Sequence, residues 1–237
     1  MAPTPLILAH RGACLETREN TLAAFRLARD AGADGVELDV RRTGDGVLVV
    51  HHDAAAADFG VLAEFPMSEV RAGVAYVPTL VEALDVLAGM LVNIEIKASP
   101  ADPDFDPEHG IVDGLVALLR DRGGHDSVIV SSFNLEAIDR VHELAPDLAT
   151  GWLVLPVMDP DDALSLVADR GHRALHPNVK SMRGDVAAEV VRHARRLDVA
   201  VNVWTVDEPE DQLALAAAGV TSIITNDPRA ARARFGA

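Results

Sequence analysis

Residues 36–40, VELDV, and residues 92–96, VNIEI, place acidic side chains within runs that otherwise have the apolar, β-branched character of buried strands. Segments with Ala, Leu and Arg at helical spacing separate most runs of this kind. Strands that are apolar on both faces and alternate with amphipathic helices are typical of a parallel sheet covered by helices. About eight strand–helix units predict a (β/α)8 barrel, the TIM-barrel architecture. The other apolar runs lie at residues 6–10, 48–52, 128–132, 151–155, 174–177, 199–206 and 222–226.

The regular alternation of strands and helices is interrupted between residues 41 and 78. Residues 43–46 predict the turn of a β-hairpin, and an irregular segment follows it. The chain shows no linker, so we predict a single domain over residues 1–237, with a short insertion after the second strand at about residues 53–78. A doubly wound open sheet is the rival architecture, but it usually carries a G-x-G-x-x-G turn after its first strand, where this chain has only HRGA.

The composition limits the partners and the location of the protein. A formal net charge of −16 repels nucleic acids and anionic membrane surfaces, so any phosphate-bearing ligand must be attracted by local cations. The N-terminus has no basic leader, and no run reaches the roughly 20 apolar residues of a membrane span. The single cysteine, Cys14, fits a reducing compartment as a small buried residue. We therefore expect a cytoplasmic protein without a membrane span, in an oligomeric state that the sequence does not indicate.

Acidic residues alternate with apolar ones in two of the predicted strands. Glu37 and Asp39 are separated by one residue, so they lie on the same face of an extended chain, and Glu95 can complete a group of three. In a barrel, polar residues at the C-terminal ends of strands are candidates for the active site. Carboxylates gathered there need a shared proton or a divalent cation. Oxygen ligands favour Mg²⁺ or Ca²⁺ over zinc, and the choice between these two ions stays open.

Basic side chains also occupy the ends of predicted strands. Lys97 lies two residues after Glu95 on the same face, where it can balance the carboxylates or bind an anion. His10 ends the first strand, and His51 and His52 end the hairpin strand. Because neighbouring residues of a strand point to opposite faces, we expect only one of His51 and His52 to enter the site. That histidine and His10 could act as general base and general acid near neutral pH.

Eight short motifs, each at a predicted strand end or helix start, occur in a fixed order along the chain. They are His10-Arg11-Gly12, Glu19-Asn20-Thr21, Glu37-x-Asp39, His52-Asp53, Glu95-x-Lys97, Ser132-Phe133, Trp204-Thr205 and the closing ITNDP at residues 224–228. In order and spacing they resemble the glycerophosphodiester phosphodiesterase family over nearly the whole chain. The resemblance implies a TIM-barrel enzyme that uses a divalent cation to hydrolyse glycerophosphodiesters to glycerol 3-phosphate and a free alcohol.

The resemblance also implies roles for individual residues, carried over by position. Glu37, Asp39 and Glu95 look like the ligands of the metal ion. His10 and His52 look like the acid/base pair, because the family's histidine directly precedes an aspartate, as His52 does here. This match leaves the neighbouring His51 without a catalytic role.

Further positions match residues that bind the substrate in this family. Arg11 and Lys97 match positions that bind the phosphate group, and Trp204 matches an aromatic residue that lines the substrate pocket. Glu19 lies either near the metal ion or simply close to the start of the first helix. Gly12 follows the basic pair of the first strand and is expected to permit a tight backbone turn.

Two positions depart from the family pattern. Residues 54–65, AAAADFGVLAEF, replace an arginine- and threonine-rich stretch that commonly follows the His-Asp motif. That segment helps to shape the side of the site that holds the leaving alcohol, so the change bears on substrate preference more than on the reaction. The closing motif has Asn226 where aspartate is frequent, and we expect this change to matter little.

These residues support a two-step hypothesis for the reaction. One histidine deprotonates the 2-hydroxyl of glycerol, which attacks phosphorus to form a cyclic phosphate, and the other protonates the leaving alcohol. The roles then reverse as water opens the ring, and the sequence leaves open which histidine begins as the base.

Three other functions are compatible with parts of the pattern. A lysophospholipid or sphingomyelin phosphodiesterase of the phospholipase D type would use the same barrel, histidines and carboxylates. A barrel without catalysis could serve as a phosphate-ligand binding protein, although every expected acid/base, metal and phosphate residue is present. An amidohydrolase would typically carry His-x-His at the end of the first strand, where this chain has His-Arg-Gly.

Overall fold

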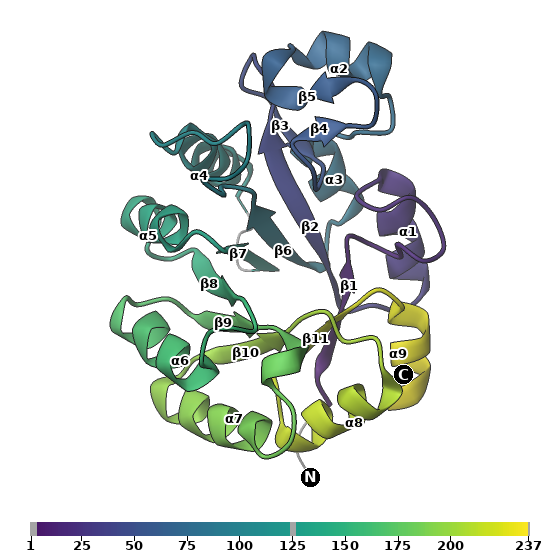
Figure 1. Ribbon diagram of the computed structural model, residues 1–237. Helices are drawn as coiled ribbons and strands as arrows, with labels where there is room; N and C mark the ends of the chain where they lie inside the picture. Colours follow the sequence, from purple (N-terminus) through teal and green to yellow (C-terminus); the bar gives the residue numbers. More distant parts are fainter. Residues whose placement is uncertain (1–3, 124–126, 237) are drawn as a thin grey trace.

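Eight parallel strands close into a barrel in the computed structural model, which describes residues 4–123 and 127–236. Each strand pairs in parallel with the next around the ring, and β1 pairs with both β11 and β2 to complete it (Figure 1). The prediction of a TIM barrel is thus confirmed. The barrel strands are β1 (Leu6–His10), β2 (Gly35–Arg42), β6 (Leu91–Ile96), β7 (Val128–Ser132), β8 (Ala149–Val154), β9 (Ala174–Pro177), β10 (Ala200–Val203) and β11 (Ser222–Thr225).

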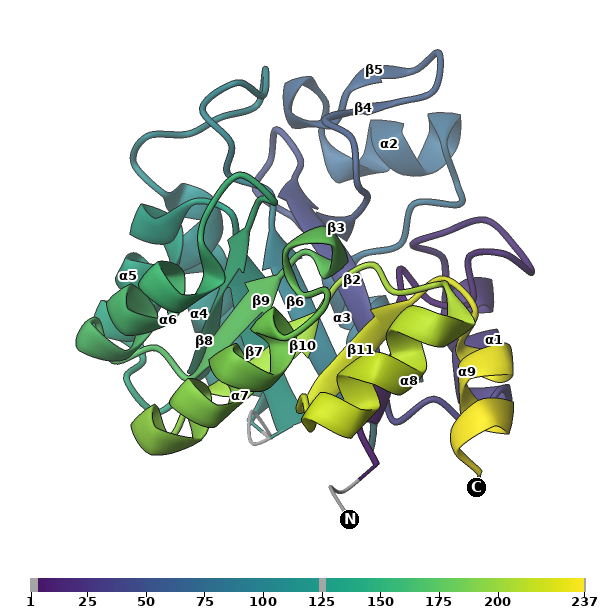
Figure 2. The same cartoon turned by 60° about the horizontal axis from the view of Figure 1, so that its bottom comes forward.

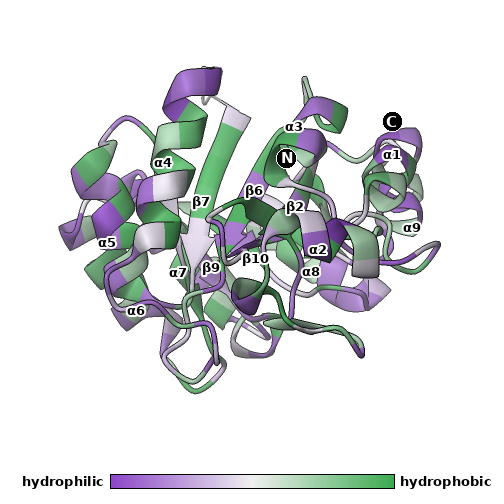
Figure 3. Ribbon diagram, turned by 90° about the horizontal axis from the view of Figure 1, so that it is seen from above, coloured by the Kyte–Doolittle hydropathy of each residue, from purple (hydrophilic) through white to green (hydrophobic). Residues whose placement is uncertain are grey.

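Helices surround the barrel and follow its strands in sequence (Figures 1 and 2). They are α1 (Leu22–Asp30), α3 (Leu80–Val86), α4 (Gly110–Arg122), α5 (Leu135–Leu144), α6 (Pro160–Asp169), α7 (Val186–Leu197), α8 (Pro209–Ala218) and α9 (Pro228–Phe235). Hydrophilic and hydrophobic residues are interspersed along these helices (Figure 3), and helices such as α7 and α5 bury their apolar residues against the barrel. The sequence did not indicate α9, which is short and rich in arginine. It begins because the side chain of Asp227 accepts a hydrogen bond from the N–H of Ala230 and because proline follows it.

The interruption after β2 forms a small structure of its own. Strand β3 (Leu48–Val50) pairs antiparallel with β2 as the expected hairpin. A two-stranded sheet of β4 (Ala55–Ala56) and β5 (Gly60–Val61) and helix α2 (Met67–Gly73) follow, and they project beyond one end of the barrel (Figure 2).

The hairpin strand is shorter than the sequence indicated. We expected residues 48–52 to be extended, but β3 ends at Val50. The N–H of His51 still donates to the carbonyl of Asp39, and the chain then bends, because the carbonyl of His52 binds the side chain of Arg41 instead of a strand neighbour. His51 and His52 therefore lie just beyond the strand.

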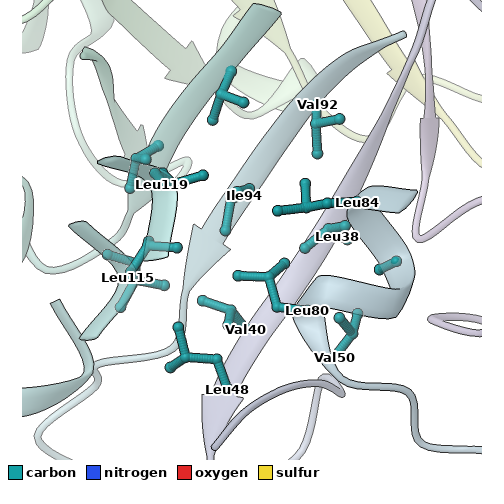
Figure 4. Packing of buried hydrophobic residues seen from close by; sticks show 14 of the residues in the cluster. Leu38, Val40, Leu48, Val50, Leu80, Leu84, Val92, Ile94, Leu115 and Leu119 are labelled. Atoms are coloured by element: carbon teal, nitrogen blue, oxygen red, sulfur yellow. The ribbon is translucent and has the colours of Figure 1, made fainter. Parts of the chain in front are cut away.

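The alternation of side chains in β2 and β6 decides which residues face the barrel interior. Leu38 and Val40 of β2 and Ile94 of β6 point outward and pack against α3 and α4 (Figure 4). Residues one position away must point to the opposite face, toward the barrel axis. The acidic residues of both strands therefore point into the barrel.

No helix in the described ranges is both long and apolar enough to span a lipid bilayer.

Candidate active site

Three carboxylates meet inside the barrel. Glu37, Asp39 and Glu95 are all buried, and one oxygen of each lies within 4.8 Å of the others. Oε2 of Glu37 accepts a hydrogen bond from the N–H of Arg11 at 3.0 Å, whereas Oε1 is buried and has no partner in the part of the chain that the structure describes. Because a buried carboxylate oxygen without a donor is costly, these three oxygen donors fit a divalent cation.

The three carboxyl groups differ in their affinity for protons. Burial and the neighbouring Asp39 raise the pKa of Glu37 to about 8. Burial also raises the pKa of Glu95 to about 7, against the opposing charge of Lys97. Burial acts on Asp39 as well, but the cations of Lys97 and Arg11 outweigh it and lower its pKa to about 2. Asp39 is therefore the member of the group that stays ionised without a metal ion.

Two basic side chains balance the carboxylates. Nε of Arg11 lies 3.2 Å from Oδ2 of Asp39, and Nζ of Lys97 lies 2.8 Å from Oδ1 of the same residue. Lys97 also pairs with Glu95. When all five groups are ionised, three carboxylates and two cations leave one net negative charge, which a divalent ion would turn into a net positive charge. Such a site can attract a phosphate group although the chain as a whole is acidic.

His10 is held by a chain of side chains from the last part of the barrel. Its Nδ1 lies 2.7 Å from Oδ1 of Asn226, and Nδ2 of Asn226 donates to Oδ2 of Asp207 at 2.7 Å. A carboxylate only accepts hydrogen bonds, so Asp207 fixes the amide of Asn226 with its oxygen toward His10. Nδ1 of His10 therefore carries the proton, and Nε2 faces the carboxylates, 3.9 Å from Oε2 of Glu37.

His52 is held by its sequence neighbour. Its Nδ1 lies 2.7 Å from Oδ1 of Asp53, and its side chain lines a cavity of about 430 Å³. Burial and Lys97 lower the pKa of His52, whereas Asp53 opposes this effect. His51 does not line this cavity and packs near Tyr76, with ring centroids 6.3 Å apart. The structure thus places His52, and not His51, at the site.

The cavity extends from the carboxylates to the loops at the mouth of the barrel. Glu95 and Lys97 lie at its inner end, and Phe133 lies on its wall. Trp204 meets Phe133 edge to face, with centroids 5.3 Å apart, and its indole N–H donates to the carbonyl of His176. Trp204 therefore supports the wall of the cavity through Phe133. The residues that line the cavity are Arg41, His52, Asp53, Ala54, Ala55, Glu95, Ile96, Lys97, Ala98, Ser99, Asp102, Pro103, Ser132, Phe133 and Asn134.

The loop after β1 is shaped around Arg11. Arg11 has a φ of 57°, and the following Gly12 has a φ of 83°, a conformation that favours glycine. A Cβ on Gly12 would lie 2.7 Å from Cβ of Ala24, so the expected tight turn is confirmed. Glu19 is more exposed and pairs with Arg11 at 2.9 Å, outside the group of three carboxylates.

Asn20 is a site residue whose role the sequence did not indicate. It is buried with a φ of 55°, and its Nδ2 donates to Oδ2 of Asp39 at 2.7 Å. The neighbouring Thr21 caps helix α1 by accepting from the N–H of Ala24. The residues of the Glu-Asn-Thr motif therefore have different roles: Thr21 caps the start of the helix, and Asn20 orients Asp39.

Comparisons with known proteins identify the family of the chain. The model of the glycerophosphoryl diester phosphodiesterase family matches residues 10–230. A glycerophosphodiester phosphodiesterase of Caldanaerobacter subterraneus subsp. tengcongensis is 34% identical, with 94% of each chain covered.

Solved structures give the same result for the fold. The crystal structure of a glycerophosphodiester phosphodiesterase from Thermotoga maritima has a TM-score of 0.82 and 27% identity, covering 97% of this chain and 98% of that one. A phosphodiesterase from Oleispira antarctica, solved in complex with its product sn-glycerol-3-phosphate, has a TM-score of 0.84 and 25% identity, covering 98% of this chain and 96% of that one. The match to the family model spans the barrel from the end of β1 to the start of α9, and the chain belongs to the glycerophosphoryl diester phosphodiesterase family, whose members are phosphoric diester hydrolases.

Proposed function

We propose that the protein hydrolyses glycerophosphodiesters to glycerol 3-phosphate and an alcohol. The observation that carries the proposal is the meeting of two buried or half-buried imidazoles, three carboxylates and two cations at one end of the barrel. The related enzyme from Oleispira antarctica was solved with sn-glycerol-3-phosphate as its product, which supports the same product here.

The proposed metal site consists of Glu37, Asp39 and Glu95. A divalent ion held there, Mg²⁺ or Ca²⁺, would supply positive charge that stabilises the negative charge developing on the phosphate. Arg11 and Lys97 lie against the same carboxylates, so their cations are in place to bind the remaining phosphate oxygens. Asn20 and the N–H of Arg11 hold Asp39 and Glu37 in position for this arrangement.

The proposed reaction begins at His10. Because Oδ1 of Asn226 accepts a hydrogen bond from the Nδ1–H of His10, the lone pair of Nε2 is free to take the proton of the glycerol 2-hydroxyl. The oxygen of this hydroxyl then attacks phosphorus, and a cyclic phosphate forms as the bond from phosphorus to the alcohol oxygen breaks. Burial and the nearby Arg11 lower the pKa of His10, against the opposing effect of the hydrogen bond to Asn226, so the imidazole starts neutral, as an initial base must.

His52 is proposed to protonate the leaving alcohol. The carboxylate of Asp53 on its Nδ1 stabilises the imidazolium, and the cavity that His52 lines has room for the alcohol. In the second step His52 takes a proton from water, the water oxygen attacks phosphorus, and His10 returns its proton to the glycerol 2-oxygen. The ring opens to glycerol 3-phosphate, and both histidines regain their starting states.

The proposal includes one catalytic domain in the cytoplasm. The family match covers every strand of the barrel from the end of β1 to β11. Burial raises the pKa of the Cys14 thiol to about 11, so this half-buried cysteine stays a thiol and suits a reducing compartment.

A product assay tests the proposed function. The protein is incubated with glycerophosphodiesters and with lysophospholipids that carry the same head groups, with and without Mg²⁺ or Ca²⁺, and both possible products are measured. Release of glycerol 3-phosphate only in the presence of metal is the expected result. Faster formation of lysophosphatidic acid from lysophospholipids would favour the phospholipase D type of reaction, and no turnover under any condition would contradict catalysis.

A further inference from the structure

Arg41 lies near the end of β2, on the same strand face as Glu37 and Asp39. Its side chain is only 4% exposed, although it lines the cavity at the mouth of the barrel. A guanidinium is rarely buried unless its donors are satisfied, because the charge would otherwise lose its hydration. The partners of Arg41 therefore indicate what this residue holds in place.

The guanidinium of Arg41 donates in three directions. Nε donates to the backbone carbonyl of His52 at 2.8 Å. Nη1 donates to both carboxylate oxygens of Asp104 at 2.6 and 2.7 Å, and Nη2 donates to Oδ2 of Asp102 at 2.9 Å. Such charge-assisted bonds are about twice as strong as neutral ones, and the planar fork of arginine fixes their directions. Arg41 thus joins β2 to the residue after the hairpin and to the loop between β6 and α4.

The segments that Arg41 joins are two walls of one cavity. His52 and Asp53 lie on one side, and residues of the β6–α4 loop, Ser99 and Asp102 among them, lie on another. His52 is therefore anchored at two points, through Nδ1 by Asp53 and through its carbonyl by Arg41. The backbone of His52 cannot shift relative to the β6–α4 loop unless the bonds of Arg41 change.

We propose that Arg41 is a positioning residue, which sets the imidazole of His52 against the leaving alcohol by tying its backbone to the β6–α4 loop. The inference rests on the proposed function, in which His52 protonates that alcohol. A displacement of about 1 Å in such a group can cost about 10²-fold in rate. Arg41 itself touches neither the carboxylates of the metal site nor the phosphate-binding side chains within hydrogen-bond distance in the described residues.

Arg42 provides a matched control on the next position of the same strand. It pairs with Asp106 of the same loop at 3.0 Å, but its side chain is 37% exposed and it contacts neither His52 nor the cavity. Arg41→Lys and Arg42→Lys therefore make the same chemical change in two ion pairs to one loop. Only Arg41→Lys removes the contact that joins His52, Asp102 and Asp104 through one guanidinium.

The test compares two substrates that share glycerol 3-phosphate and differ in the leaving group. Glycerophosphocholine releases an alcohol that needs a proton, whereas the 4-nitrophenyl ester of glycerol 3-phosphate releases a stable phenolate. Because His52 acts again in the second step with both esters, the readout is alcohol release in a single turnover, which reports the first step alone. In Arg41→Lys we expect this rate to fall about 10²-fold for the choline ester and less than about threefold for the nitrophenyl ester. In Arg42→Lys we expect both values to stay within about twofold of the wild type.

An equal loss for both esters in Arg41→Lys would mean a merely structural role and would overturn the proposal, as would wild-type kinetics for both. If Arg41→Lys does not fold by circular dichroism, Asp104→Asn replaces it, because this variant weakens the fork while leaving Arg41 in place. We expect it to lower the ratio of single-turnover alcohol release from the choline ester to that from the nitrophenyl ester about 10-fold, and an unchanged ratio would overturn the proposal. Wild-type protein that cleaves neither ester with metal present would contradict the proposed function itself.

Discussion

Nδ1 of His10 lies 2.7 Å from Oδ1 of Asn226, a residue 216 positions further along the chain. Asp207 fixes the direction of this bond, because its carboxylate accepts from the amide nitrogen of Asn226. Asp207 thus determines the tautomer of His10, although it contacts Asn226 and not the imidazole itself. We expected Asn226 to matter little where related chains carry aspartate, but its side chain binds a proposed catalytic group directly.

Reversal of this hydrogen-bond chain should reverse the tautomer. In Asp207→Asn, an amide nitrogen replaces Oδ2 and would face the amide nitrogen of Asn226, so Asn226 turns and presents its nitrogen to His10. Nδ1 of His10 must then accept, and Nε2 carries the proton. We expect a loss of about 10²-fold or more in kcat and exchanged ¹⁵N chemical shifts of the two imidazole nitrogens.

Asp211→Asn is the control for this change. Asp211 pairs with Arg183 on the surface at 2.8 Å and makes no contact with Asn226. The same substitution there should leave kcat and the imidazole spectrum unchanged. Normal ¹⁵N shifts for His10 in Asp207→Asn would show that Asp207 does not determine the tautomer.

Loss of either proposed acid/base histidine should slow the reaction strongly. We expect His10→Ala and His52→Ala each to lower the rate of glycerol 3-phosphate release by 10²-fold or more, the usual contribution of a general acid or base. His51→Ala should keep nearly full activity, because His51 packs beside Tyr76 and does not line the cavity. Near-normal turnover in both His10→Ala and His52→Ala would rule out the proposed chemistry.

Much of the fold could be predicted from periodicity. The strands of the barrel are rich in apolar residues and buried on both faces, so their runs stand out, and alternation alone puts Glu37 and Asp39 on one face. Helix α9 was missed because its arginines hide the apolar spacing, with Pro228 and Ala231 as its buried residues. Its capping residue, Asp227, decides where it begins.

The contacts around the site residues could not be predicted in the same way. Asn226 and Arg41 act through partners that only the closed barrel and its loops bring near. The sequence also did not indicate His176, which lies inside the barrel beside Asn202. Its strand has only four residues, too few for their alternation to show which side chains face the barrel interior. Periodicity specifies the face of a strand, whereas these contacts depend on the conformations of long loops.

Removal of the proposed metal ion should abolish the proposed activity and lower thermal stability. Chelation with EDTA should stop glycerol 3-phosphate release, and Mg²⁺ or Ca²⁺ should restore it. A ligand that binds only the folded state stabilises it, by about 2.7 kcal/mol at a concentration 100 times its Kd, so the melting temperature should rise on addition of the active ion. In Glu95→Gln we expect the ion to leave the melting temperature unchanged. In Glu108→Gln, a control at an exposed loop residue, the ion should still raise the melting temperature. An equal rise in both variants would mean that the ion binds elsewhere.

The metal-free protein should lose stability as the pH rises from about 5 to about 8. The pKa of Glu37 is raised to about 8 and that of Glu95 to about 7, so the folded chain keeps protons that the unfolded chain gives up above about 4.5. Folding stability decreases with pH wherever the folded state binds more protons. Urea unfolding in EDTA across this range measures the effect.

Glu37→Gln isolates this effect from the titration of other groups. Its amide cannot titrate, so the difference in unfolding free energy between wild type and variant should change in favour of the variant as the pH rises. Asp39 has the opposite effect at acidic pH, because its pKa is lowered to about 2. The stability that its ionised carboxylate contributes is lost as the pH falls below the usual pKa of aspartate. A difference that is independent of pH between 5 and 8 would contradict the raised pKa of Glu37.

The close approach of β8 and β9 beneath the site makes Gly151 hard to replace. A Cβ on Gly151 would lie 2.5 Å from Nε2 of His176, which is fully buried and accepts from Nδ2 of Asn202 at 3.0 Å. Burial lowers the pKa of His176 to about 3, so the ring stays neutral and cannot escape to solvent. Gly151→Ala should therefore destabilise the protein by about 1–3 kcal/mol, the usual cost of overpacking. Gly114→Ala in α4, where the nearest atom is 4.0 Å away, should instead stabilise by about 0.5–1 kcal/mol, and equal urea midpoints for the two variants would contradict the steric argument.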